Sequence, residues 1–170
     1  MKRHLILVGL PGAGKSTVGR LVAASLGTPI QDVDALIEER LGISIKEIFA
    51  SRGEAEFREL ERAETVQLLL DPPAVIVPGG GWAAQPGNLE SVVGKALTVY
   101  LATSPSTALA RVGDVDTRPL LAGDDRAARF ESLLAAREPY YERCDVTVPT
   151  DGRTVGEIAR EVIELALECE

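Results

Sequence analysis

Aromatic residues and cysteine are scarce in this chain of 170 residues. Phe, Trp and Tyr together make up 4% of the sequence, and there are two cysteines and one histidine. Because large rings are few, a buried core has to be built from Leu, Val, Ile and Ala, which is typical of a parallel sheet covered by helices. Cys144 and Cys169 have no C-x-x-C spacing, so we interpret them as reduced thiols without a redox role.

Positive charge and long apolar runs are also lacking. The net charge is −8, and no run of 18 or more apolar residues occurs. A negative surface disfavours general binding to nucleic acid or to an anionic membrane. The start of the chain, Met1-Lys2-Arg3, leads directly into an apolar run without a cleavage-site pattern. We therefore expect a soluble, cytoplasmic protein with no nucleic-acid or membrane partner.

A glycine-rich motif near the start is the clearest feature that is present. The stretch from Gly9 to Thr17 reads G-L-P-G-A-G-K-S-T and matches the phosphate-binding loop pattern G-x-x-x-x-G-K-[ST]. The apolar run 4–8 before it predicts a buried strand, and the segment 16–26 after it predicts a helix that ends at Gly27. His4 lies inside that strand, where a packed histidine is favoured over a metal ligand.

The spacing of this motif predicts a nucleotide site. Its glycines let successive backbone N–H groups point into one hollow at the positive end of the new helix, where an anion is held. Lys15 is expected to reach the β- and γ-phosphates of ATP, and the Ser16 hydroxyl is placed to ligate Mg²⁺. The ATP-binding residues expected in the loop are Gly12, Ala13, Gly14, Lys15, Ser16 and Thr17.

The rest of the chain alternates predicted strands and helices. Strands are expected at 4–8, 28–34, 74–77, 97–101 and 146–148, and helices at 16–26, 35–51 with a break near Gly42, 55–70, 88–93, 104–112, 126–143 and 155–167. Residues 113–125 lack apolar periodicity, and we expect a surface loop there. This order predicts an α/β fold with a parallel sheet in a single domain over 1–170, with ligands at the carboxyl ends of the strands.

Two acidic residues follow the second predicted strand. Alternation along a strand places the side chains of Asp32 and Asp34 on one face, within reach of a metal ion or of a hydroxyl beside it. The alternative is a turn in which Asp34 caps the next helix. The pattern alone leaves both interpretations open.

Glycines and arginines supply further candidates. The triple glycine at 79–81 follows a buried strand, and it indicates either a close approach of backbone to a ligand or a flexible connection. The Glu-rich helix around Arg58 favours a solvated pair with Glu61 over a binding role. Arg118 lies in the predicted loop, where it is either solvated or a closing arginine of the kind that phosphoryl-transfer enzymes use. Arg137 has no independent signal.

Taken together, these motifs resemble the shikimate kinase family. The resemblance covers the phosphate loop, D-V-D at 32–34, G-E and F-R-x-x-E within 53–61, G-G-G at 79–81, R-P-L-L at 118–121 and an Arg before P-Y-Y at 137–141. It implies a single-domain, three-layer P-loop kinase of the nucleoside monophosphate kinase-like fold, with a five-stranded parallel sheet in the order 2-3-1-4-5. It also implies a substrate-binding helical segment at about 34–62, a short lid at about 113–125, and a monomer.

The activity that the resemblance implies is ATP-dependent, Mg²⁺-assisted phosphorylation of the 3-hydroxyl of shikimate, a step of aromatic amino-acid biosynthesis. The residues implied to bind shikimate are Arg58 and Arg137 at its carboxylate, Asp34 and the backbone of Gly79, Gly80 and Gly81 at its hydroxyls, Phe49 and Phe57 at its ring, and Glu61, which holds Arg58. The implied catalytic residues are Asp34, Lys15 and Arg118. Arg111 is implied to lie over the adenine, with Mg²⁺ held by Ser16 and, through water, by Asp32.

Pro78 and Trp82 depart from the pattern of the family on either side of the triple glycine. An indole at the rim of the substrate site is expected to narrow it, which motivates a second hypothesis with another small hydroxy acid, such as gluconate, as acceptor. A third hypothesis is a regulatory module that binds ATP without transferring phosphate. The presence of Asp34 and Arg118 argues against that third hypothesis.

Overall fold

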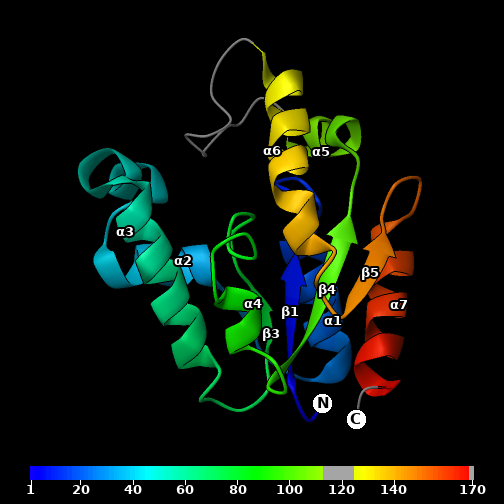
Figure 1. Ribbon diagram of the computed structural model, residues 1–170. Coiled ribbons are helices and arrows are strands. Elements are labelled where there is room, and N and C mark those ends of the chain that lie inside the picture. The colour runs from blue at the N-terminus through cyan, green and yellow to red at the C-terminus, as the bar shows by residue number, and fades with distance from the viewer. Residues whose placement is uncertain (113–124, 169–170) are drawn as a thin grey trace.

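The computed structural model describes residues 1–112 and 125–168. Five parallel strands form one sheet in the order β2-β3-β1-β4-β5, with helices on both faces (Figure 1). The strands are β1 (His4–Val8), β2 (Ile30–Asp32), β3 (Val75–Val77), β4 (Ala96–Ala102) and β5 (Val146–Pro149). The helices are α1 (Lys15–Leu26), α2 (Val33–Leu41), α3 (Ile45–Leu68), α4 (Asn88–Ser91), α5 (Pro105–Val112), α6 (Arg126–Tyr141) and α7 (Val155–Glu168). The expected fold class and strand order are confirmed.

Strand β1 lies in the middle of the sheet, between β3 and β4, and all five of its residues are buried. Because side chains alternate along a strand, they divide between two cores. Leu5 and Leu7 pack with residues of α1 and α7, whereas Ile6 and Val8 pack with residues of α2 to α6 on the opposite face. The molecule therefore has three layers, and the loop after Val8 begins at the centre of the sheet.

The helices before β3 follow the predicted breaks. Helix α2 ends at Gly42, and α3 begins with a capping box between Ser44 and Glu47. Inside α3, Gly53 has φ 84°, which interrupts the helix between the segments predicted at 35–51 and 55–70. This interruption turns the second part of α3, which carries Arg58, relative to the first.

Strand β2 is shorter than the predicted strand 28–34. It ends at Asp32, and Asp34 lies in the first turn of α2. The side chain of Asp32 accepts a hydrogen bond from Ala35 N at 3.3 Å, so Asp32 and not Asp34 caps this helix. Neither of the two interpretations left open by the sequence, a shared strand face or a cap by Asp34, describes this pair. An Asp side chain that caps a helix offers the backbone a local alternative to continued strand pairing.

The predicted lid at 113–125 falls, apart from Asp125, outside the described residues, and so does Arg118. Asp125 caps α6 by accepting a hydrogen bond from Ala128 N at 3.2 Å. In the part of the chain that the structure describes, no helix is both long enough and apolar enough to cross a membrane.

The one histidine is packed, as predicted. His4 is buried, and its Nδ1 accepts a hydrogen bond from Ala74 N at 3.2 Å. Burial lowers the pKa of His4 below its usual 6.5, although Asp71 acts in the opposite direction. Because the pKa is lower in the folded state, this group contributes stability above the unfolded pKa, and the contribution is lost as the pH falls through the folded pKa.

We therefore expect the free energy of unfolding to fall more steeply between pH 7 and pH 5 in the wild type than in His4→Gln. The difference in slope is at most about 1.4 kcal/mol per pH unit, the value for one proton. Urea denaturation at a series of pH values measures it. Parallel pH profiles of the two proteins would contradict this assignment.

Candidate active site

A cavity of about 540 Å³ opens at the carboxyl ends of the strands, where the loop after β1 meets the start of α1. Its lining comes from several elements: residues 12–18, Asp32, Asp34, Val77, Pro78, Arg111, Arg153, Thr154, Val155 and Ile158. The cavity therefore brings together the phosphate loop and both predicted acidic residues, at the edge of the sheet where α/β proteins bind ligands.

The phosphate loop has the charge distribution of an anion site. Gly14 precedes α1, and the first turn of this helix contains no acidic residue that would offset its positive end. Lys15 is 6% exposed, and its Nζ donates to Gly9 O at 2.9 Å and to Leu10 O at 3.0 Å. A phosphate group would bind a buried ammonium group more strongly than these two neutral carbonyl groups do, because it carries negative charge.

Two oxygen ligands lie together beside the loop. The Ser16 hydroxyl donates to Asp32 Oδ2 at 2.9 Å, while the other Asp32 oxygen caps α2. Hydroxyl and carboxylate oxygens are the ligands that Mg²⁺ prefers, and this ion usually keeps several waters and binds substrate phosphates as well. Within residues 1–112 and 125–168, no cluster of three or more His, Cys, Asp or Glu side chains could hold a metal ion alone. The site thus fits a magnesium ion that arrives with a nucleotide.

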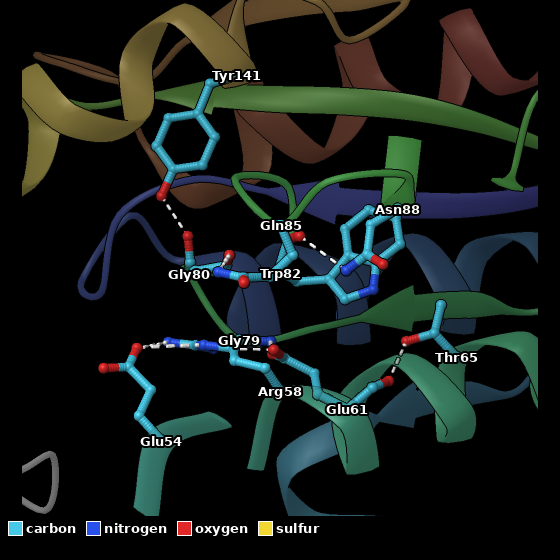
Figure 2. Close-up of polar contacts among 11 residues, drawn as sticks. Glu54, Arg58, Glu61, Thr65, Gly79, Gly80, Trp82, Gln85, Asn88 and Tyr141 are labelled. Carbon is cyan, nitrogen blue, oxygen red and sulfur yellow. Dashed lines mark hydrogen bonds and ion pairs between the residues drawn. The ribbon is translucent and has the colours of Figure 1, made fainter. Parts of the chain in front are cut away.

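Helix α3 places a buried ion pair at the other side of the site (Figure 2). Arg58 Nη1 donates to Glu61 Oε2 at 2.8 Å, and Glu61 Oε1 accepts from Gly79 N at 2.9 Å. Glu54 Oε1 binds the far side of the same guanidinium, at 3.0 Å from Nη2 and 3.3 Å from Nε. The side chains of Arg58 and Glu61 are 10% and 0% exposed. The Glu-rich sequence favoured a solvated pair of Arg58 and Glu61, but the pair is buried.

The electrostatics of this pair follow from burial and mutual attraction. Burial raises the pKa of Glu61 above its usual range, an effect that Arg58 and the Gly79 N–H oppose. Burial by itself lowers the pKa of Arg58, but Glu61 and Glu54 outweigh it and the pKa is raised. The guanidinium therefore stays charged, and its partners fix its orientation.

The triple glycine passes through a space with no room for side chains. Cβ atoms added at these positions would lie 2.5 Å from Glu61 Oε1 at Gly79, 3.1 Å from Gly9 O at Gly80, and 2.5 Å from Arg58 Nη2 at Gly81. The backbone at 79–81 thus packs between the phosphate loop and the guanidinium. Of the two interpretations of this motif, close approach of the backbone is the one that the packing supports.

Arg137 approaches the same backbone from α6. It is 9% exposed, and its Nη1 would lie 3.3 Å from a Cβ added at Gly80. Phe49 and Phe57 form a tilted ring pair with centroids 4.9 Å apart, and the Arg58 guanidinium lies 5.2 Å from the centre of the Phe57 ring. Two guanidinium groups therefore lie close to the glycine turn, and the aromatic pair lies beside one of them, Arg58.

Arg111 lies on the nucleotide side of the cavity. Its guanidinium donates to Thr150 O at 3.3 Å, to Thr150 Oγ1 at 3.4 Å and to Ala13 O at 3.5 Å. These contacts join the end of α5, the phosphate loop and the turn after β5. The guanidinium thus borders the cavity next to the phosphate loop.

Trp82 does not lie at the rim of the site. It is 1% exposed and belongs to the core on the face of the sheet covered by α2 to α6. The expectation of an indole that narrows the substrate pocket was wrong. The residue follows a glycine turn, where no periodicity tells which way a side chain points.

Comparisons with known proteins agree with this geometry. The family model for shikimate kinase matches residues 11–166. The chain belongs to the shikimate kinase family. The shikimate kinase of Moorella thermoacetica is 42% identical over 164 residues, which is 96% of this chain and 94% of that protein. The shikimate kinase of Mycobacterium avium is 43% identical, with 96% and 93% covered.

Solved structures of the shikimate kinase family superimpose closely. The Acinetobacter baumannii shikimate kinase, solved in complex with shikimate, gives a TM-score of 0.93 at 32% identity, with 99% of this chain and 94% of that chain covered. The Aquifex aeolicus shikimate kinase gives 0.82 at 34% identity, with 97% and 96% covered. A gluconokinase from Sinorhizobium meliloti, at 0.62 and 21%, with 99% and 93% covered, shares the fold. The chain is accordingly an enzyme, a kinase that uses ATP.

Some residues at the site carried no assigned role in the sequence. Glu54 stands in the G-E motif, four residues before Arg58, and binds its guanidinium as an i,i+4 pair. Arg153 and Thr154 line the nucleotide side of the cavity from the turn after β5. The sequence did offer one signal for these two residues, since a basic residue directly before a helix start is typical of a site that binds an anion.

Gly12 of the phosphate loop packs against α5. This residue has φ +80°, and an added Cβ would lie 2.3 Å from Ala108 O and 2.8 Å from Val112 Cγ2, both in α5. Gly12→Ala should weaken ATP binding at least about tenfold, because the loop has to leave α5. Gly27→Ala is the control. This position also has positive φ, +62°, but has open space around it, so only the backbone penalty of about 1–2 kcal/mol applies.

Calorimetric titration with ATP and urea denaturation of both variants check this expectation. Equal ATP affinity in Gly12→Ala and Gly27→Ala would show that contact with α5 does not hold the loop.

Proposed function

We propose that the chain transfers the γ-phosphoryl group of ATP to the 3-hydroxyl of shikimate, giving shikimate 3-phosphate and ADP in aromatic amino-acid biosynthesis. One observation carries this proposal: the guanidinium groups of Arg58 and Arg137 flank the bare backbone at 79–81, and a Cβ added at Gly80 would lie 3.1 Å from Gly9 O of the phosphate loop. A small carboxylic acid with several hydroxyls fits paired guanidinium groups and free backbone N–H donors.

The acceptor is bound at its carboxylate by Arg58 and Arg137. Glu61 holds the Arg58 guanidinium from its buried side, while Glu54 binds the same guanidinium from its solvent side. The hydroxyls of the acceptor meet Asp34 and the backbone of Gly79, Gly80 and Gly81. Phe49 and Phe57 form the wall against which the ring lies. This arrangement fixes both ends of a small ring and so orients one hydroxyl toward the phosphate loop.

The nucleotide is bound by the loop at 12–17, with Arg111 against the adenine. Lys15 turns from the carbonyls of Gly9 and Leu10 to the β- and γ-phosphates. Ser16 would hold Mg²⁺ directly and Asp32 would hold it through water. When bound, this ion would offset the negative charge that develops on the phosphate groups.

The reaction is an in-line displacement. The acceptor oxygen forms a bond to the γ-phosphorus, the bond from that phosphorus to the bridging oxygen of ADP breaks, and the hydroxyl proton leaves toward Asp34. Lys15 and Arg118 neutralise the charge on the moving phosphoryl group. The role of Arg118 rests on the sequence resemblance, since this residue lies outside the described part of the chain.

We also propose how the enzyme is organised. The protein acts in the cytoplasm as a single-domain monomer over residues 1–170, with a substrate-binding segment at about 34–62 and a lid at about 113–125. The single sheet supports one domain, and the net charge of −8 supports a small-molecule rather than a nucleic-acid partner. The hypothesis that gluconate is the acceptor rested on Trp82 at the rim of the site, and it is no longer supported because Trp82 is buried in the core.

A coupled assay of ADP release tests the reaction. The purified protein should form ADP in proportion to shikimate when ATP and Mg²⁺ are present, and not when gluconate replaces shikimate. Lys15→Ala should lower kcat at least about 100-fold, the usual scale for losing a group that stabilises transition-state charge. Lys95→Ala is the control, because Lys95 is exposed and directly precedes β4, at the end of the strand away from the cavity. Its kcat should match that of the wild type. Absence of shikimate-dependent turnover would refute the proposal.

Arg58→Ala tests the acceptor site separately. Loss of a charged hydrogen bond of about 2–3 kcal/mol corresponds to a KM for shikimate about 30- to 160-fold higher. The KM for ATP should change less than about threefold, because the nucleotide side keeps its contacts. Arg160→Ala, on the exposed face of α7, is the control. Similar increases in both KM values would count against the assigned role.

A further inference from the structure

Tyr141 contacts the glycine turn from behind. Its hydroxyl donates to Gly80 O at 2.5 Å, as Figure 2 shows. The side chain is 0% exposed at the end of α6, and its ring lies 4.9 Å from the ring of Tyr100. A fully buried ring packed against a second ring keeps one orientation, so the hydroxyl is held at this carbonyl.

The bond to Gly80 fixes more than one oxygen. The Gly80 carbonyl and the Gly81 N–H belong to the same peptide unit, which is planar and trans, so the two groups point in opposite directions. Glycine on both sides lets such a unit rotate with little steric resistance. A donor on the carbonyl therefore determines where the Gly81 N–H points.

The other polar groups of the turn are already engaged. Gly79 O accepts from Trp82 N at 3.1 Å, Gly81 O accepts from Gln85 Nε2 at 3.2 Å, and Gly79 N donates to Glu61. The N–H groups of Gly80 and Gly81 have no partner among residues 1–112 and 125–168. Both residues are buried, and a buried N–H without a partner is rare unless a ligand or water supplies the acceptor.

We propose that Tyr141 is a positioning residue for the acceptor substrate, whose hydroxyl keeps the Gly80–Gly81 peptide from rotating and directs the Gly81 N–H toward an acceptor hydroxyl. This inference rests on the proposed function, which puts shikimate at the glycine turn. Arg137 lies one turn earlier on the same helix. Helix α6 thus carries both Arg137, which binds the carboxylate of the acceptor, and Tyr141, which holds the Gly80–Gly81 peptide.

The test is Tyr141→Phe, which keeps the ring contact with Tyr100 and removes the hydroxyl. Loss of one hydrogen bond of typical strength predicts a KM for shikimate about tenfold higher, with the KM for ATP within about twofold of wild type. Tyr140→Phe is the matched control. Tyr140 is the neighbouring tyrosine, 37% exposed, and should show wild-type values for both substrates. Thermal unfolding confirms that each variant is folded.

A second variant separates the hydroxyl from the ring. 4-Aminophenylalanine at position 141 retains a donor and should restore the KM for shikimate. A merely structural role would leave the ratio of the two KM values unchanged in Tyr141→Phe, and that result, or a failure of the amino variant to restore it, overturns the inference.

The Gly81 amide resonance provides a readout that does not depend on turnover. In ¹⁵N spectra it should shift in Tyr141→Phe and stay in place in Tyr140→Phe. If the wild type shows no turnover with shikimate, the proposed function fails, while this resonance still decides whether Tyr141 holds the peptide. If the wild type turns over shikimate and Tyr141→Phe matches it in KM and in the Gly81 resonance, only the inference about Tyr141 fails.

Discussion

One buried carboxylate holds together the part of the site where we propose that the acceptor binds. Glu61 gives one oxygen to the Arg58 guanidinium and the other to the Gly79 N–H, and its side chain is 0% exposed. An ionised carboxylate is costly to bury unless strong partners replace its water. The helix that carries Arg58 and the turn that follows β3 are therefore fixed relative to each other, because separating them would leave this charge unpaired.

The sheet then brings the acceptor side to the nucleotide side. Strands β1, β2 and β3 are neighbours, and the phosphate loop, Asp32 and the glycine turn follow their carboxyl ends. At Gly80 the two sides come close together, since a Cβ added there would lie 3.1 Å from Gly9 O. Phosphoryl transfer depends mainly on positioning and charge stabilisation, and this contact fixes the distance between the groups that do each.

The sequence predicted the fold better than the orientation of individual side chains. The alternation of elements predicted a parallel sheet, but the order of its strands came from the resemblance, because periodicity carries no information about which strands are neighbours. Arg58 looked solvated in its Glu-rich helix, and its burial depends on a turn distant in the sequence that packs against it. The helix cap formed by Asp32 and the burial of Trp82 were not predicted, because capping and turn geometry depend on contacts that a pattern of apolar residues does not describe.

The packing of the triple glycine also bears on how the enzyme could escape an inhibitor. A compound that accepts hydrogen bonds from Gly80 and Gly81 would bind atoms of the main chain, which replacement of a side chain does not remove. Adding a side chain at either position would push against the phosphate loop or the Arg58 guanidinium. Resistance through a side chain at these positions would therefore damage the enzyme itself, which makes this backbone a durable target in this protein.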